Sequence, residues 1–146
     1  MWRSKRWDSF RLVTPNWQYK LPGYHYFGDD PEGFMQKDQI VQYMEDYAKS
    51  FAPPITEGVE VLSVCSFQGG FAVTTTIGEY IAEVVATSSG SYYLPKIPPL
   101  AQNLGKSIVQ LHSSQYKNPQ SLPDNVLFVG TGQSGCQIAE DLHLCA

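Results

Sequence analysis

The sequence contains no apolar run that approaches the roughly 20 residues needed to cross a bilayer. Its charged, aromatic opening has no apolar segment of the kind that a signal peptide requires. Lys and Arg together number 10 against 14 Asp and Glu, so the basic surface that nucleic acid attracts is missing. We therefore predict a cytoplasmic protein with no membrane span and no nucleic-acid partner.

Cysteine and histidine are also scarce, and their spacing suits neither a metal site nor a nucleophile with its base. The cysteines are odd in number and widely spaced among apolar residues, so we interpret them as reduced core thiols. They are Cys65, Cys136 and Cys145. The three histidines lack metal-ligand spacing, and no Ser/His/Asp or Cys/His triad can be proposed. They are His25, His112 and His143.

What is present is the composition of a folded protein, with 42% hydrophobic and 16% charged residues. Residues 1–34 are rich in Trp, Tyr and Phe interleaved with Pro and Gly, and they follow neither a helical nor a strand period. We predict a long ordered loop there, with one short strand at residues 10–13. Its aromatic side chains either pack against something large and flat or form ordinary core beneath the loop.

The middle of the chain predicts one helix followed by strands. Residues 38–51 repeat apolar side chains at helical spacing, and Pro53 with Pro54 prevents the helix from continuing. Three segments rich in Val, Ile and Thr follow, separated by glycine-containing turns, and they predict an antiparallel meander. These segments are residues 58–67, 71–76 and 80–87. Residues 88–105 read as a loop, and residues 109–112 as a short strand.

A glycine fingerprint closes the sequence. Residues 126–129 form a short apolar run of the kind that parallel sheets bury on both faces, and G-T-G-Q-S-G follows at residues 130–135. Gly130 would give the tight turn, Gly132 would leave room for a pyrophosphate, and Gly135 would let the following helix pack closely. We interpret this as the start of a dinucleotide-binding unit. An accidental glycine turn is the alternative.

Several segments, taken in order, resemble flavin-containing monooxygenases and related FAD- and NADP-dependent oxidoreductases. The stretches that carry the resemblance are Trp2-Arg3, residues 6–15, Leu21-Pro22-Gly23, the helix at residues 40–51, Val84-Val85-Ala86-Thr87, the residues His112, Tyr116, Lys117 and Pro119, and the turn at residues 130–135. The resemblance implies an α/β protein with an incomplete two-dinucleotide-binding, Rossmann-like flavoprotein fold that carries a three-stranded antiparallel meander. It also implies FAD and NADP as cofactors, with a small-molecule substrate and O2.

The resemblance implies a role for each matching residue. Residues implied to contact FAD are Trp2, Arg3, Thr14, Val61, Ala86 and Thr87. Residues implied to hold the NADP pyrophosphate are Gly130, Gly132, Gln133, Ser134 and Gly135. Asn16 would be the catalytic side-chain amide near the reactive flavin carbon, or else a turn residue that bonds its own backbone. His112 would be a buried, satisfied histidine rather than a base, and Tyr116 with Lys117 would fix a loop.

The sequence departs from the family pattern at both ends. No FAD fingerprint precedes Trp2, and too few residues follow Gly135 for a βαβ unit of ~30 residues. We expect a partial FAD-binding domain at 1–105 and the start of an NADP-binding domain at 106–146. The chain is then a fragment of a flavin-dependent oxidoreductase, inactive alone. The alternatives are a non-catalytic truncated polypeptide, a product that needs a partner chain to complete its fold, or a small nucleotide-binding module.

Overall fold

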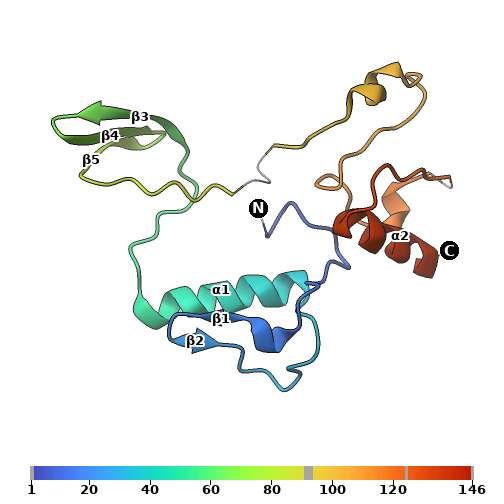
Figure 1. Ribbon diagram of the computed structural model, residues 1–146, viewed down its shortest axis with the longest axis horizontal. Coiled ribbons are helices and arrows are strands. Elements are labelled where there is room, and N and C mark those ends of the chain that lie inside the picture. Colours follow the sequence, from blue (N-terminus) through green and yellow to red (C-terminus); the bar gives the residue numbers. More distant parts are fainter. Residues whose placement is uncertain (1, 91–93, 124, 146) are drawn as a thin grey trace. The chain divides into compact units, whose positions relative to one another are not determined.

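The computed structural model describes residues 2–90, 94–123 and 125–145, and these form two compact units. The first unit combines Met1–Ala52 with Pro95–Ala146, and the second is Pro53–Leu94. Figure 1 shows the two helices in the first unit and the three-stranded sheet in the second. The loop expected at 88–105 includes residues 91–93, which lie outside the described residues. No helix in the described part of the chain is long and apolar enough to cross a membrane.

Helix α1 (Lys37–Phe51) begins one residue before the predicted start and ends where the sequence predicts. At its start, the backbone N–H of Gln36 donates to the side-chain oxygen of Gln39 at 2.8 Å. Ile40 is the buried residue of the apolar stripe. The helix ends at Ala52, whose left-handed φ of 45° turns the chain before the prolines.

The opening segment is mainly loop, as predicted. A single turn of 3-10 helix, η1 (Asn16–Gln18), precedes a two-residue hairpin of β1 (Lys20–Leu21) and β2 (Tyr24–His25). The strand predicted at residues 10–13 is wrong, because only one isolated bridge forms there, between Arg11 and Gln36. The segment obtains its order instead from side chains that enter the core.

The core of the first unit draws on segments that are far apart in the sequence. Its fully buried hydrophobic residues are Trp7, Phe10, Met35, Ile40, Tyr116 and Ile138. Trp7 is 1% exposed, with its ring centroid 4.9 Å from that of Phe10 in an edge-to-face arrangement. Part of the aromatic opening is therefore ordinary core, whereas Trp17 and Phe27 stay exposed.

The second unit is the predicted meander, with β3 (Val61–Phe67), β4 (Gly70–Thr75) and β5 (Gly78–Ala82) antiparallel in that order. Phe67 pairs with Gly70 across a two-residue turn, in which Gln68 and Gly69 have φ values of 46° and 82°. Both positive angles match the hairpin turn whose twist suits the flanking strands. Strand β5 ends five residues before the prediction, because residues 83–87 have no neighbouring strand to pair with among the described residues.

Two further predicted strands, at 109–112 and 126–129, do not form. Leu127 is 87% exposed and Val129 is 65% exposed, so the apolar run before the fingerprint is not buried on either face. A parallel strand is stable only between neighbours that complete its hydrogen bonds, and the described residues supply none. The regular elements of this part of the chain are the short 3-10 turns η2 (Pro99–Asn103) and η3 (Pro119–Ser121) and the helix α2 (Gln133–Cys145).

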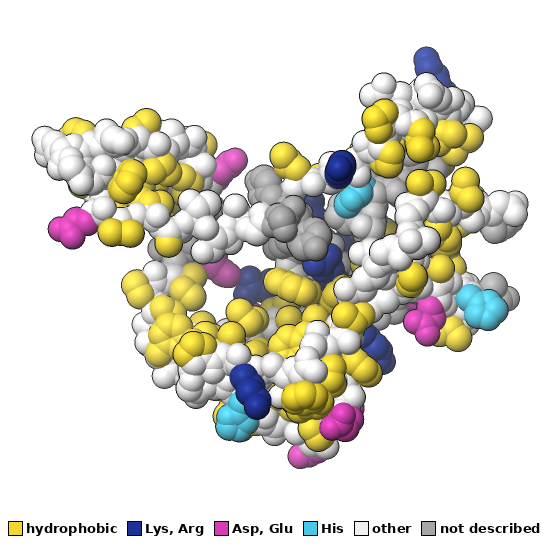
Figure 2. All heavy atoms as spheres, viewed as in Figure 1, with side chains coloured by type: hydrophobic (Ala, Val, Ile, Leu, Met, Phe, Trp, Pro, Cys, Tyr) yellow, Lys and Arg dark blue, Asp and Glu magenta, His cyan; other side chains and the backbone are white. Residues whose placement is uncertain are grey.

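Large apolar side chains remain on the surface of each unit. In Figure 2 hydrophobic side chains lie on the visible face of the meander, and they are plentiful on the first unit as well. All seven residues of β3 are exposed. The three cysteines are free thiols but are exposed, so their prediction as core residues is wrong: the elements that carry them lack a covering layer among the described residues.

Candidate nucleotide-binding site

The turn at residues 130–135 has the backbone that its glycines predict. Gly130 adopts a φ of 115°, which side-chain-bearing residues rarely adopt. A Cβ on Gly135 would lie 2.7 Å from the carbonyl oxygen of Gly130, so only glycine fits against the turn. A Cβ on Gly132 would meet nothing within 4 Å, so its outer side is open. The open position is the one where a phosphate would need room.

Helix α2 starts directly from this turn. The N–H of Cys136 donates to the carbonyl of Gly132 at 3.1 Å, which makes Gly132 the residue just before the helix. The amides of Gln133, Ser134 and Gly135 precede that first bond, so they have no acceptor within the helix. The N-terminal end of a helix also carries partial positive charge. The turn therefore offers backbone donors to an anion.

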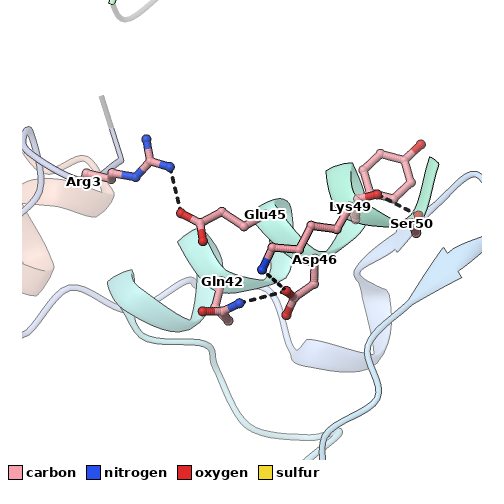
Figure 3. Close-up of polar contacts among 7 residues, drawn as sticks. Arg3, Gln42, Glu45, Asp46, Lys49 and Ser50 are labelled. Carbon is pink, nitrogen blue, oxygen red and sulfur yellow. Dashed lines mark hydrogen bonds and ion pairs between the residues drawn. The ribbon is translucent and has the colours of Figure 1, made fainter. Parts of the chain in front are cut away.

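One predicted flavin-side residue, Trp2, belongs to an aromatic and cationic cluster. The guanidinium of Arg6 lies 4.8 Å from the Trp2 ring and 5.1 Å from the Phe10 ring. Arg3 forms an ion pair with Glu45 of α1 at 2.7 Å, drawn in Figure 3. Trp2 is 38% exposed, so part of its ring is free to meet another group.

Beside Trp2 lies an apolar groove of about 410 Å³. Its walls come from the opening segment, the small hairpin and the first half of α1, and include Leu12, Leu21, Met35, Tyr43 and Met44. The hydroxyl of Tyr43 donates to the carbonyl of Tyr19 at 3.2 Å, and burial raises the pKa of this phenol. The groove is thus lined mainly by apolar and aromatic side chains, with Gln18 and Lys20 as its polar members.

Asn16 is 3% exposed, and both ends of its amide are engaged. Its Nδ2 donates to the carbonyl of Asp30 at 2.8 Å, and its Oδ1 accepts the N–H of Met35 at 2.8 Å. The side chain thereby fastens the loop at residues 30–35 to η1, bonding backbone far along the chain rather than its own turn. Thr14, the neighbouring predicted residue, is half-buried.

The other predicted FAD residues belong to the second unit. Val61 begins β3 and is 56% exposed, whereas Ala86 and Thr87 are exposed and follow the last strand. The structure thus groups Trp2, Arg3, Thr14 and Asn16 with the glycine turn in one compact unit, and the remaining predicted residues in the other. No group of three or more His, Cys, Asp or Glu suited to a metal ion occurs among the described residues.

Comparison with known proteins decides the family. Residues 22–145 match the family described as pyridine nucleotide-disulphide oxidoreductase. The chain belongs to this family. It is 45% identical over 143 residues to an uncharacterised CzcO-like oxidoreductase of Geobacillus kaustophilus, a match that covers 97% of this chain and 40% of the relative. It is also 28% identical over 151 residues to indole-3-pyruvate monooxygenase YUCCA6 of Arabidopsis thaliana, covering 97% and 36%.

Among solved structures, a flavin-containing monooxygenase from Stenotrophomonas maltophilia superposes with a TM-score of 0.80 at 24% identity, covering 99% of this chain and 44% of that one. The resemblance and the fold class predicted from sequence are thereby confirmed: this pyridine nucleotide-disulphide oxidoreductase family member has the flavin monooxygenase fold. The chain spans about two fifths of the length of these curated relatives.

In this oxidoreductase family member, Tyr116 makes a buried contact that the sequence did not predict as part of a site. Tyr116 is 3% exposed, and its hydroxyl donates to the carboxylate of Asp141 on α2 at 2.5 Å. Burial, and then the bond to Asp141, raise the pKa of this phenol. The match of Tyr116 and Lys117 to the family signature was the available signal, but a sequence match does not reveal a partner 25 residues away.

Two residues near Tyr116, His112 and Asn118, make hydrogen bonds of their own. The Nδ1 of His112 accepts the N–H of Ser114 at 3.2 Å, so this nitrogen is satisfied locally, as predicted. The residue is half-buried, whereas a buried histidine was predicted. Asn118 donates from its amide to Asp8 at 2.9 Å. This bond is the largest influence and, with the charge of Lys37, holds the pKa of Asp8 below its ordinary value, although burial acts in the opposite direction.

Proposed function

We propose that this chain is the central part of a flavin-dependent oxidoreductase that uses FAD and NADPH to oxidise or oxygenate a small substrate with O2. One observation carries the proposal: the turn from Gly130 to Gly135 opens α2 with free amide donors and an unobstructed outer side. The family membership and the flavin monooxygenase fold agree with it. In such enzymes the cofactors carry the redox chemistry, while the protein binds and orients them.

The residues of the turn fit a pyrophosphate. Gly132 has no side chain to block the approach of phosphate oxygens, and nothing in the structure fills that space. The amides of Gln133, Ser134 and Gly135 would donate to those oxygens at the positive end of α2. We assign this group to NADP. The acidic or basic residue that distinguishes NAD from NADP lies ~20 residues beyond the turn, so the assignment rests on the family resemblance.

The flavin side would be the groove beside Trp2. Arg3 and Thr14, which the resemblance also assigns to FAD, belong to the same compact unit. Apolar walls and a half-exposed indole suit a flat ring system, and they would exclude water from it. Asn16 would act on the flavin side by fixing the loop at 30–35, since its amide is buried and bonded at both ends. By the family resemblance, Val61 would reach the adenine end of FAD through its backbone, and Ala86 and Thr87 would line the crossover beside FAD. The division into an FAD part at 1–105 and an NADP part at 106–146 is part of this proposal.

The second candidate is a truncated polypeptide that has no catalytic activity of its own. The observation that favours it is the exposed run at 126–129, which a complete dinucleotide-binding sheet would cover on both faces. A partner chain carrying the neighbouring strands would complete the sheet and restore activity. In this case the polypeptide alone would bind nucleotide weakly, purify without colour and oxidise no NADPH, and a yellow protein with stoichiometric FAD would exclude it.

The test is calorimetric titration of the purified chain with NADP⁺, comparing the natural sequence with Gly132→Ala and Gly105→Ala. The methyl group at 132 enters open space, so it leaves the fold intact but blocks the approach of phosphate. Gly105 is equally tolerant of a methyl group and lies outside the turn, so it is the control. We expect Gly132→Ala to weaken binding by about tenfold or more, a change of about 1.4 kcal/mol. Equal affinity in all three proteins would contradict the proposal.

A further inference from the structure

Three consecutive residues, Tyr116, Lys117 and Asn118, connect parts of the first unit that the sequence separates widely. We call them the signature segment. On one side Lys117 holds the opening of the chain: its Nζ donates to the carbonyl of Ser4 at 2.6 Å. The same ammonium lies 3.4 Å from the carbonyl of Arg6. The signature segment thus binds the backbone of the opening through a side chain.

The backbone strengthens this connection. The N–H of Asp8 donates to the carbonyl of Lys117 at 2.9 Å, and the amide of Asn118 donates to the Asp8 carboxylate at 2.9 Å. Together with the lysine contacts, these bonds hold residues 4–8 along the signature segment. Trp7 lies in the middle of this stretch and is the most deeply buried side chain of the core.

On the other side the signature segment holds helix α2. The Tyr116 hydroxyl donates to Asp141 at 2.5 Å, two turns beyond the start of the helix. The Tyr116 ring lies 6.3 Å from the ring of Trp7 and shares the core with Ile138 of the same helix. A hydrogen bond to a carboxylate is stronger than one between neutral groups, and partial burial strengthens it further.

A second, independent contact joins the same two elements. Gln137 of α2 donates from its Nε2 to the carbonyl of Arg11 at 3.0 Å. The opening segment carries Trp2, Arg3 and Thr14, which are the proposed flavin-side residues. Helix α2 carries the proposed NADP turn at its start. The signature segment therefore lies between the elements that would hold the two cofactors.

We propose that Tyr116 and Lys117 are positioning residues that fix the opening segment against α2 and so keep the two nucleotide-binding elements in one arrangement. The significance for the cofactors rests on the proposed function. The connection itself is a property of this chain, so it can be tested without any cofactor. Neither side chain needs to touch a nucleotide for this role.

The experiment combines hydrogen exchange of the full chain with NADP⁺ titration. Four variants are compared with the natural sequence: Tyr116→Phe, Asp141→Ala, Asp141→Asn and the double variant Tyr116→Phe with Asp141→Ala. Tyr116→Phe keeps the ring in the core and removes only the hydroxyl. Asp141→Asn keeps an oxygen that accepts the phenol hydrogen. Tyr80→Phe, on β5 in the second unit, is the matched control.

We expect Tyr116→Phe and Asp141→Ala each to speed exchange of the Asp8 and Phe10 amides by about fivefold or more, with unchanged helical circular dichroism. The double variant should be no faster than either single variant, because both remove the same bond. Asp141→Asn should restore most of the protection, and NADP⁺ affinity should fall and recover in parallel. A residue that only fills the core would give additive effects and no recovery with Asn.

Unchanged exchange at residues 4–10 in both single variants would overturn the positioning role, as would additive effects in the double variant. Where Tyr116→Phe fails to fold, Lys117→Met tests the other end of the connection, and it should speed exchange of the α2 amides. Absence of NADP⁺ binding by the natural sequence would count against the proposed function alone, since exchange coupling between α2 and residues 4–10 is read without nucleotide.

Discussion

The carbonyl oxygen of Gly130 lies 2.7 Å from the place that a Cβ of Gly135 would occupy. The two ends of the fingerprint turn are therefore in contact through backbone alone. This contact aligns the first amides of α2 with the open side of Gly132. It explains in atomic terms why the third glycine of the pattern cannot carry a side chain, whatever its backbone amide binds.

Gly135→Ala should consequently damage the turn itself. The added methyl group would meet a backbone oxygen, and overpacking of this kind costs about 1–3 kcal/mol. We expect a lower free energy of unfolding in urea and loss of NADP⁺ binding together. Gly132→Ala should lose binding alone, so the pair separates folding from recognition. Unchanged stability of Gly135→Ala would show that the turn is looser than the structure indicates.

Asn16→Ala should destabilise the first unit. The substitution leaves the buried N–H of Met35 without its acceptor, and an unsatisfied buried group costs about 1–3 kcal/mol. Asn103→Ala, on the exposed η2 turn, should change stability by less than about 0.5 kcal/mol. Urea unfolding followed by tryptophan fluorescence measures both. Equal midpoints for the two variants would contradict the fastening role of Asn16.

Gly69→Ala should weaken the meander. Gly69 has a φ of 82°, and a side chain in the left-handed region costs about 1–2 kcal/mol. We expect faster hydrogen exchange in β3 and β4, with the amides of α1 unaffected because the helix belongs to the other unit. Gly105→Ala, at a position without positive φ, is the control and should leave the exchange of the strands unchanged.

Acid should weaken the attachment of the opening segment through Asp8. Its pKa is lowered from 3.8 in the folded chain, so the ionised form contributes stability above that value and loses it as pH falls through the lower folded pKa. The side chain is 59% exposed, which limits the contribution to below about 1 kcal/mol. Asp8→Asn should therefore be less stable than the natural chain at pH 7 and converge with it as the pH falls below the folded pKa of Asp8. A constant difference across that range would count against this role.

The sequence predicted those elements that depend on local chemistry. The apolar stripe of residues 38–51 and its proline stop give α1. Glycine-containing turns between segments rich in β-branched residues give the meander, although its first turn lies at Gln68-Gly69, one residue before the predicted Gly69-Gly70. The glycines of the fingerprint give the turn and the start of α2. In each case the partners of a residue lie within a few positions along the chain.

What the sequence could not predict depends on distant partners. Residues 126–129 have strand-like composition, but a strand forms only when a neighbour supplies hydrogen bonds, and none is present among the described residues. The cysteines were expected in a core, but they are exposed because no layer of the described residues covers the elements that carry them. Asn16 shows the opposite case: its partners at Asp30 and Met35 lie along an irregular loop, and no period in the sequence points to them.

The composition of the core sets an order for folding. Trp7 and Ile138 come from opposite ends of the chain, so the first unit cannot close until α2 has been synthesised. The meander pairs neighbouring segments only, and it can fold while the ribosome is still making the rest. Until α2 is present, Trp7 and Phe10 of the opening segment lack part of the core that buries them. The two units therefore differ in contact order, because the meander rests on neighbouring segments and the first unit on distant ones.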